Sequence, residues 1–317
     1  MKPVILGITA GDPCGIGPEI VLKALGSKQL NRRVRWIVIG DALVFKKTAK
    51  NLRLKFPTGT SFIDCPTPHF FHPGRSSAAA GLASLEYLNE SVRLWRKGVI
   101  QGVVTAPVTK AAIQKSFSSF VGHTEYFAQA TRTRNVVMLF AAEKLRVVIL
   151  TRHIPLKAVS RAVTKPLLTS AIRMTVASLK RDFGIPKPRV IVCGINPHAG
   201  EGKAASEESK VVRPVIQALR REGIRCEGPV AADGFFAGPI TQDAVITPYH
   251  DQGLIPFKMA ARDSGCQLTL GLPFVRTSPD HGSALEIAGQ GIANPGSMIY
   301  ALNLAARLVL RRNAHSR

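Results

Sequence analysis

Three histidines in this sequence each stand just beyond a short apolar run, where a buried strand would end. They are His153 after residues 145–150, His198 after residues 190–195 and His250 after residues 244–247. Ligands of α/β proteins bind in the crevice beyond the carboxyl ends of the strands, so these side chains can converge although 45 and 52 residues separate them. Three imidazoles with an open coordination position form a catalytic metal site. The alternative is a set of loop histidines that hydrogen-bond to the backbone.

The third histidine belongs to a dense polar stretch, YHDQGLIPFK, at residues 249–258. Asp251 follows His250 directly, and Lys258 lies eight residues after that histidine. A carboxylate in this position could orient the imidazole, bind the metal or act as a general base.

Further groups suited to anions lie elsewhere in the chain. His123 and Thr124 stand at the start of an expected helix, whose free N–H groups favour an anion. Arg276 follows an apolar strand, and its guanidinium can grip a phosphate or a carboxylate with two hydrogen bonds. Residues 281–294 form a loop of small residues with glycines at 282, 289 and 291, which could fold closely around a flat cofactor.

Alternating strands and helices must position these groups. Buried strands are expected at residues 4–10, 34–39, 102–106, 136–142, 145–150, 190–195 and 244–247, and long helices at 76–97, 165–183, 206–222 and 297–310. Such alternation favours an α/β fold with a largely parallel sheet. The glycines at 11, 15 and 17 permit a close approach to another backbone or a ligand, but their spacing is not G-x-G-x-x-G.

Composition excludes several classes of protein. The 317 residues carry 43 Lys and Arg against 20 Asp and Glu, a net charge of +23, yet no basic tract of five or more and no nucleic-acid-binding signature occurs. Five scattered cysteines without a C-x-x-C pair argue against a disulfide framework and a thiolate zinc site. No apolar run is long enough to span a bilayer, and no signal-peptide cleavage site follows the first apolar run. We expect a cytoplasmic protein that binds neither nucleic acid nor membrane.

Five ordered blocks make the chain resemble the family of 4-hydroxythreonine-4-phosphate dehydrogenases, which act in pyridoxal phosphate synthesis. The blocks are GITAGDPCGIGPEI (7–20), VGHTEYFA (121–128), NPHAGEG (196–202), YHDQGLIPFK (249–258) and TLGLPFVRTSPDHGSALEIAG (269–289). The last block is also similar to the cofactor loop of isopropylmalate and isocitrate dehydrogenases, in which HGSA, an acidic residue and GIANP wrap the adenosine half of NAD.

The resemblance implies a fold and an assembly. We expect two α/β/α domains with largely parallel sheets and a cleft between them, as in isocitrate and isopropylmalate dehydrogenases. A cofactor-side domain would comprise residues 1–122 and 272–317, and a metal- and dimer-forming domain residues 123–271. A homodimer would complete each active site.

The resemblance also implies roles for individual residues. The metal ligands would be His153, His198 and His250, around one divalent ion of zinc, magnesium or cobalt. The substrate would contact His123, Thr124, Lys258, Gln267 and Arg276. The family usually has asparagine where this chain has Gln267. NAD, or alternatively NADP, would bind His281, Gly282, Glu286 and Asn294. Asp251 and Lys258 are the two candidates for the catalytic base.

The implied reaction is the oxidation of 4-phosphohydroxy-L-threonine to 2-amino-3-oxo-4-phosphooxybutanoate, which loses carbon dioxide to give 3-amino-2-oxopropyl phosphate. The closest alternative is a dehydrogenase of the same family that acts on another phosphorylated four-carbon acid or on a dihydrodiol carboxylate. This alternative stays open because Gln267 departs from the family pattern. An alternative of another class is a nucleic-acid-associated protein on a dehydrogenase scaffold, which only the +23 charge suggests.

Overall fold

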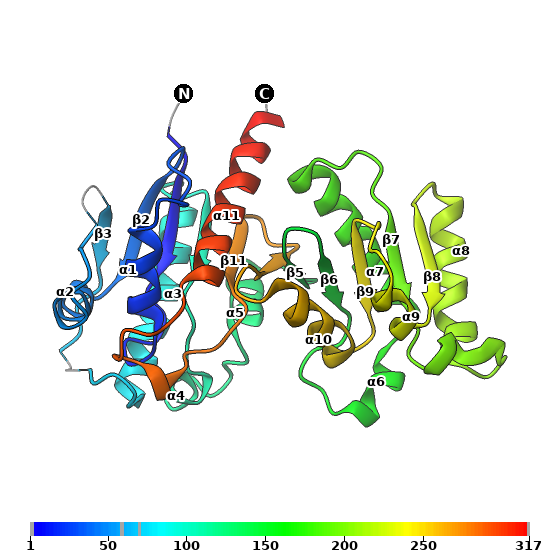
Figure 1. Cartoon of the computed structure of the whole chain (residues 1–317), viewed down its shortest axis with the longest axis horizontal. Helices are drawn as coiled ribbons and strands as arrows, with labels where there is room; N and C mark the ends of the chain where they lie inside the picture. The colour runs from blue at the N-terminus through cyan, green and yellow to red at the C-terminus, as the bar shows by residue number, and fades with distance from the viewer. Residues whose placement is uncertain (1–2, 58–59, 69–70, 316–317) are drawn as a thin grey trace. The chain divides into compact units, whose positions relative to one another are not determined.

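The computed structural model describes residues 3–57, 60–68 and 71–315, which form two compact units (Figure 1). Unit 1 contains residues 1–134, 263–268 and 272–317, and unit 2 contains residues 135–262 and 269–271. Both units are α/β structures with mostly parallel strands. The α/β class with largely parallel sheets, expected from the alternating pattern, is confirmed.

The strands of unit 1 lie in the order β3-β2-β1-β4-β11-β10. They are β1 (Ile5–Thr9), β2 (Arg35–Gly40), β3 (Ser61–Asp64), β4 (Gly102–Thr105), β10 (Cys266–Leu270), whose last two residues belong to unit 2, and β11 (Val275–Pro279). All neighbours run parallel except β10 and β11, which pair antiparallel with Gln267 opposite Ser278. This pairing places Gln267 and Arg276, which lie nine positions apart in sequence, on adjacent strands.

Helices cover both faces of the sheet in unit 1. They are α1 (Gly17–Leu25), α2 (Ala42–Asn51), α3 (Ala78–Arg96), α4 (Lys110–Gln114), α5 (His123–Ala130), the short 3-10 helix η4 (Leu285–Ile287) and α11 (Gly296–His315). In Figure 1, α1 and α11 lie in front of the sheet and α3 lies behind it. Side-chain oxygens cap two of these helices, Asp41 at α2 and Ser77 at α3, and so fix where the helices begin.

The strands of unit 2 lie in the order β5-β6-β9-β7-β8. They are β5 (Val137–Ala141), β6 (Arg146–Ile149), β7 (Val190–Cys193), β8 (Cys226–Val230) and β9 (Ala244–Thr247). Strands β5 and β6 form an antiparallel pair, whereas β6, β9, β7 and β8 run parallel. Three consecutive parallel strands, β6, β9 and β7, therefore end at the same edge of the sheet.

Among the described residues, five α-helices and three 3-10 or π-helical segments connect these strands or extend their helices. They are α6 (Leu156–Ala162), α7 (Lys165–Ser178), η1 (Leu179–Phe183), η2 (Pro197–Gly202), η3 (Glu208–Val212), α8 (Arg213–Arg221), α9 (Ala232–Ala237) and α10 (His250–Ala261). The helices expected at residues 165–183 and 206–222 each include a π-helical turn, at η1 and η3, which the apolar spacing did not predict.

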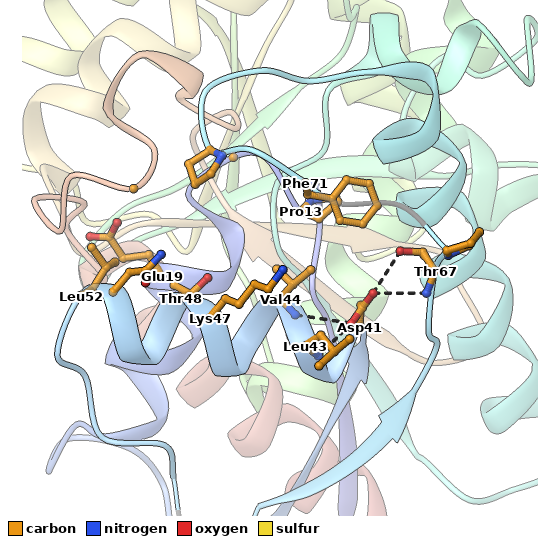
Figure 2. Close-up of a pocket in the computed structure, with 15 residues that line it drawn as sticks. Pro13, Glu19, Asp41, Leu43, Val44, Lys47, Thr48, Leu52, Thr67 and Phe71 are labelled. Atoms are coloured by element: carbon orange, nitrogen blue, oxygen red, sulfur yellow. Dashed lines mark hydrogen bonds between the residues drawn. The ribbon is translucent and has the colours of Figure 1, made fainter.

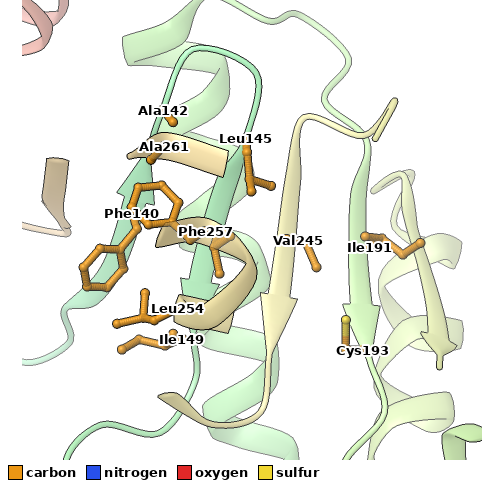
Figure 3. Close-up of a cluster of buried hydrophobic side chains, with 11 residues drawn as sticks. Phe140, Ala142, Leu145, Ile149, Ile191, Cys193, Val245, Leu254, Phe257 and Ala261 are labelled. Carbon is orange, nitrogen blue, oxygen red and sulfur yellow. The ribbon is translucent and has the colours of Figure 1, made fainter. Parts of the chain in front are cut away.

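The core of unit 2 shows how α10 is fixed (Figure 3). Leu254 and Phe257 of α10 are buried against Phe140 and Ile149 of the sheet. A Cβ atom at Gly253 would stand 2.4 Å from the Thr247 hydroxyl, so only glycine permits this close approach of helix and strand. Full burial of each large apolar side chain contributes about 1.5–3 kcal/mol. The packing therefore holds the start of α10, which carries His250, directly against the end of β9.

Two segments fall in a different unit from the domain expected for them. The expected boundaries put residues 123–134 and 263–268 in the second domain, whereas they belong to unit 1. Packing explains the difference, because the ring of Phe127 in α5 meets the ring of Phe274 edge-on at 5.6 Å. Ser297 also donates a hydrogen bond of 2.6 Å to the carbonyl of Gly265.

Among the described residues, no helix is long and apolar enough to cross a membrane.

Candidate functional site

Unit 2 presents the three histidines on connections that leave adjacent parallel strands. His153 follows β6, His250 opens α10 after β9, and His198 lies in η2 after β7. Since these strands are neighbours in the order β6-β9-β7, the placement expected from the apolar runs is confirmed. The roles of the three side chains remain a prediction.

Two of these histidines lie in an unusual backbone conformation. His153 has φ of 48° and His198 has φ of 51°, both in the left-handed region that non-glycine residues seldom adopt. In η2, five residues in succession, from His198 to Gly202, have positive φ. Such strain persists where the surrounding structure fixes it, and it concentrates at functional sites.

Two glutamate carboxylates, of which one is buried, hold the turn that carries His198. Glu208, which is fully buried, accepts hydrogen bonds from the backbone N–H groups of Ile195 and Asn196 at 2.7 and 2.8 Å. Its other oxygen accepts from the Asn196 amide at 3.0 Å. Glu207 also accepts from that amide, at 2.8 Å, and from the hydroxyl of Ser160 in α6. The same pair of carboxylates therefore fixes the turn before His198 and the helix that follows the His153 loop.

Hydrogen bonding shifts the pKa values of both carboxyl groups. Burial acts to raise the pKa of Glu208, but the hydrogen bonds from Asn196 and Ile195 together outweigh it and the net shift is downward. Hydrogen bonds from Ser160 and Asn196 likewise lower the pKa of Glu207. Both side chains are therefore carboxylates at neutral pH.

His250 is oriented by its neighbour in sequence. Its Nδ1 lies 2.6 Å from the Asp251 carboxylate, which leaves Nε2 to meet a ligand. A carboxylate on one ring nitrogen is the usual partner of a metal-binding histidine, because it fixes the tautomer and the ring orientation. Asp251 is mostly exposed, and Lys258, seven residues further along the same helix, lies on the same exposed side of α10.

The donor set of unit 2 suits a divalent ion in part. The ring centroids of His153 and His250 lie 5.8 Å apart, close to the separation of roughly 5 Å for two imidazoles on one tetrahedral ion. Within one chain, no three His, Cys, Asp or Glu side chains of the described residues are grouped so as to hold a metal ion. His153 and His250 are thus the pair that geometry supports, and His198 is placed at the same edge of the sheet.

Unit 1 contains a buried arginine. Arg276 of β11 is only 2% exposed, and it donates hydrogen bonds to the Thr105 hydroxyl and the Gln267 amide oxygen. Its guanidinium also lies over the Phe127 ring, 5.9 Å from the centroid. Burial lowers the pKa of Arg276 to about 9, and the Glu125 carboxylate opposes that shift. The guanidinium is therefore charged at neutral pH and held in one orientation.

Gln267 helps to orient this arginine. Its amide oxygen accepts from Arg276 and, at 3.1 Å, from the hydroxyl of Ser278 on the paired strand. The longer amide, which departs from the asparagine usual in the family, reaches across the antiparallel pair to the guanidinium. It is 5% exposed, and its oxygen contributes by fixing Arg276.

His123 and Thr124 begin α5 in the same unit, as expected. Thr124 is 1% exposed, and the Nε2 atom of His123 is shielded from solvent and makes no hydrogen bond. Burial, together with the charges of Arg276 and Lys110, holds the pKa of His123 well below its usual value. The imidazole is therefore neutral at physiological pH, and a shielded polar atom without a partner is suited to a ligand.

The expected cofactor loop is anchored to unit 1 at both ends. The Ser283 carbonyl accepts from Ile16 N–H at 2.9 Å, and the Ser283 and Thr109 hydroxyls lie 2.9 Å apart. At the other end, Glu19 accepts from Ala293 N–H at 2.9 Å.

The four residues predicted to hold the cofactor differ in their surroundings. Gly282 and Glu286 are exposed, whereas Asn294 accepts from Gly296 N–H at 2.8 Å. The Nε2 atom of His281 is shielded and makes no hydrogen bond, so the loop offers one polar atom that suits a bound cofactor. The assignment of all four stays a prediction.

Several residues that shape these sites were not assigned a role from the sequence. Thr105, Glu125 and Lys110 surround Arg276 and His123, and Glu207 and Glu208 support the His198 turn. Thr105 and Lys110 could have been found, because the TAPVTK stretch follows the end of a strand. The two glutamates carried no such signal, since they lie in a helical stretch that reads as a solvated face.

The fold and its polar groups define a class of protein, an α/β enzyme of two units whose charged and imidazole groups follow the strands. A family model described as the pyridoxal phosphate biosynthetic protein PdxA matches residues 27–305, and this chain belongs to that family.

Proteins of known name share nearly the whole chain. This chain is 41% identical to 4-hydroxythreonine-4-phosphate dehydrogenase of Desulforapulum autotrophicum, and the alignment covers 96% of this chain and 95% of that protein. A solved structure of the enzyme of the same name from Klebsiella pneumoniae has a TM-score of 0.84 at 32% identity, covering 96% and 99% of the two chains. A terephthalate 1,2-cis-dihydrodiol dehydrogenase from Burkholderia xenovorans has a TM-score of 0.66 at 31% identity, covering 96% and 98%. The chain is therefore a dehydrogenase, which suggests a nicotinamide cofactor.

Proposed function

We propose that this protein oxidises 4-phosphohydroxy-L-threonine with NAD to 2-amino-3-oxo-4-phosphooxybutanoate, which decarboxylates to 3-amino-2-oxopropyl phosphate. The observation that carries the proposal is Arg276, a buried and oriented cation beside a neutral His123. The names of the relatives in the PdxA family support the same substrate.

Arg276 would hold an anionic group of the substrate. Its guanidinium is fixed by Thr105 and Gln267, so little side-chain entropy is lost when a phosphate or carboxylate binds. His123, neutral and with a shielded Nε2, would donate or accept a single hydrogen bond without adding charge. Thr124 and the first N–H groups of α5 would complete an anion-binding surface.

His153, His198 and His250 would hold one divalent ion, with zinc, magnesium and cobalt as the candidates. A bound divalent ion would lower the pKa of the substrate hydroxyl and polarise the ketone that forms. Asp251 would keep the His250 ring in place through its contact with Nδ1. Asp251 and Lys258, both on the exposed side of α10, are the candidates for the base that removes the hydroxyl proton.

The loop at residues 281–294 would hold the dinucleotide. When bound, NAD would accept the hydride. His281 offers its unpaired Nε2, and Glu286 is exposed and can reach a ribose hydroxyl. NADP is the alternative cofactor, and it would place a phosphate where Glu286 favours a hydroxyl.

A second copy of this chain would complete the site. The exposed side of α10 combines Asp251 and Lys258 with Ile255 and Met259, which are 59% and 75% exposed. Leu156 at the start of α6 is 69% exposed. Apolar side chains interspersed with charges on one helix side suit a subunit contact.

The test is the formation of reduced nicotinamide, measured by absorbance, with 4-phosphohydroxy-L-threonine before and after chelation and with each divalent ion added back. We expect turnover to disappear on chelation and to return with one or more of the three ions. Undiminished turnover after rigorous metal removal would contradict a mechanism in which the three histidines hold a divalent ion.

A second candidate substrate is a cyclic dihydrodiol carboxylate. The similarity to the terephthalate dihydrodiol dehydrogenase and the glutamine at position 267 favour it. In the same assay, terephthalate cis-dihydrodiol and a phosphorylated four-carbon hydroxy acid without the amine compete directly with the proposed substrate. The highest kcat/KM among the three identifies the physiological class.

A further inference from the structure

Helix α10, which carries His250, begins without a side-chain cap. The start of α2 shows the usual arrangement, in which the Asp41 carboxylate accepts hydrogen bonds from the N–H groups of Leu43 and Val44 (Figure 2). At α10 the N-cap residue is Tyr249, and its side chain makes no such bond. Other contacts must therefore hold the first turn of α10 in place.

One of these contacts is made by Gln252 in that first turn. Its Nε2 atom donates a hydrogen bond of 2.8 Å to the carbonyl oxygen of Gly194, the residue that follows β7. Its Oε1 atom is shielded from solvent and makes no hydrogen bond. A rotated amide would set Oε1 against the Gly194 carbonyl, acceptor against acceptor, so Nε2 must be the donor. The bond to Gly194 offsets part of the cost of the shielded oxygen and holds the side chain in one orientation.

Gly194 is packed against the turn that carries His198. A Cβ atom on Gly194 would lie 2.8 Å from the Cα atom of Ala199, so the two backbone segments approach closely. Ala199 is buried and follows His198 directly. The N–H group of Gly194 also donates to the Val230 carbonyl at 2.8 Å. A displacement at the Gly194 carbonyl therefore reaches the backbone beside His198.

The connection that carries His153 has a corresponding bond. The hydroxyl and the N–H group of Thr151 both donate to the carbonyl of Pro248, at 2.7 and 3.1 Å. Thr151 thus joins the His153 connection to the residues before His250. Gln252 joins the residues after His250 to the His198 connection.

We propose that Gln252 is a positioning residue that fixes the separation between His250 and His198. This inference rests on the proposed function, in which both histidines hold one divalent ion. Two ligands on separate loops bind an ion tightly when their separation is set before the ion arrives, because reorganisation lowers affinity. Gln252 acts through the Gly194 carbonyl and needs no contact with the ion or the substrate.

The experiment uses Gln252→Met, which keeps the length of the side chain and removes the donor. Gln217→Met makes the same exchange at an exposed position of α8 and is the matched control. Thermal unfolding confirms that each variant is folded. Hydrogen exchange of the metal-free protein, followed by mass spectrometry, compares residues 194–199 with residues 148–151.

We expect exchange at residues 194–199 to accelerate by about fivefold in Gln252→Met, because the loss of one hydrogen bond lowers the free energy of local opening. Exchange at residues 148–151 should stay unchanged, since the bond from Thr151 to Pro248 remains. Gln217→Met should exchange like the wild type in both segments.

Affinity for Co²⁺, measured by competition with a chromophoric chelator, tests the link to His198. We expect Gln252→Met and His198→Ala each to weaken Co²⁺ binding by about tenfold or more, and Gln217→Met to leave it unchanged. In the His198→Ala background, Gln252→Met should weaken Co²⁺ binding by less than about twofold, because no imidazole then remains to be positioned. A general loosening of the start of α10 would instead weaken binding equally in both backgrounds.

Three results would overturn the proposal: unchanged hydrogen exchange in Gln252→Met, unchanged Co²⁺ affinity in that variant, or an equal loss of affinity in both backgrounds. If His198→Ala itself leaves Co²⁺ affinity unchanged, the three-histidine site is contradicted and the role of Gln252 is lost with it. If His198→Ala weakens Co²⁺ binding and Gln252→Met does not, the site stands and only the role of Gln252 is overturned.

Discussion

The candidate site residues of the two units are held in place in opposite ways. In unit 1, Arg276 is buried, and its partners Thr105 and Gln267 are buried with it. In unit 2, His153 and His198 are exposed side chains on left-handed backbone. The arginine is positioned by side-chain packing, whereas these histidines are positioned by the backbone of their loops.

This difference reflects what each group is expected to bind. A cation that grips an anion must be fixed before the ligand arrives, since reorganisation reduces affinity. A metal ligand must leave its nitrogen open to the ion, so it is the turn beneath the side chain that must be rigid. In unit 2, the buried Glu208 fixes the His198 turn through hydrogen bonds. In unit 1, Gln267 fixes the Arg276 side chain in the same way.

The largest effect is expected from removing the buried cation. Arg276→Met should lower kcat/KM by about 10²- to 10⁴-fold, because two charge-assisted hydrogen bonds of about 1.5–3 kcal/mol each are lost. Arg276→Lys should recover little of this, since an ammonium cannot reproduce the planar fork. Steady-state kinetics with the proposed substrate measures the change. The exposed Arg307→Met is the matched control, and a loss below about threefold in Arg276→Met would remove Arg276 from the anion site.

The next effect concerns the orientation of His250. Asp251→Asn keeps the size of the side chain but removes the charge beside Nδ1, so affinity for the divalent ion should fall by about 10- to 100-fold. Competition with a chromophoric chelator measures that affinity without reference to turnover. Asp233→Asn, an exposed aspartate of α9, is the control. If ion affinity is unchanged while kcat collapses, Asp251 is the base and does not orient the ligand.

Much of this comparison was predictable from the sequence, and the reason lies in periodicity. Apolar runs such as residues 244–247 mark strands reliably because both faces of a central parallel strand are buried, and β9 has these bounds. The polar residues after such runs must then lie at one edge of the sheet. His153, His198 and His250 were found by this rule, and their placement after adjacent strands is confirmed.

What could not be predicted depends on contacts between distant residues. The link from Glu208 to Asn196 requires a π-helical turn and a left-handed turn to meet, and neither has a sequence signature. Gln267 read only as a departure from a family pattern until strand pairing placed it beside Arg276 and Ser278.

The support beneath His198 should affect stability more than turnover. Glu208→Gln replaces a carboxylate that accepts three hydrogen bonds, and it leaves an amide group facing the Asn196 amide. We expect the free energy of unfolding to fall by about 1–3 kcal/mol at neutral pH, measured by urea denaturation. The exposed Glu201→Gln in the same turn serves as the control.

The pH dependence of this loss has a definite sign. The pKa of Glu208 is lower in the folded protein than its usual value, so its stabilising effect is complete above the usual pKa and is lost as the pH falls through the folded value. Glutamine does not titrate, so the difference between wild type and Glu208→Gln should shrink on acidification below about pH 4. A difference that stays constant from neutral to acidic pH would show that the charge of Glu208 does not stabilise the turn.

The smallest effect is expected at Gln267. In Gln267→Asn the amide oxygen withdraws by about one carbon–carbon bond, so its hydrogen bonds to Arg276 and Ser278 lengthen or are lost. Arg276 keeps its bond to Thr105 and its charge, so KM should rise by about three- to tenfold with little change in kcat. Parallel kinetics with 4-phosphohydroxy-L-threonine and terephthalate cis-dihydrodiol show whether the longer amide also selects the substrate. A change in the ratio of the two kcat/KM values would assign specificity to Gln267, whereas an equal change for both substrates would limit its role to holding the guanidinium.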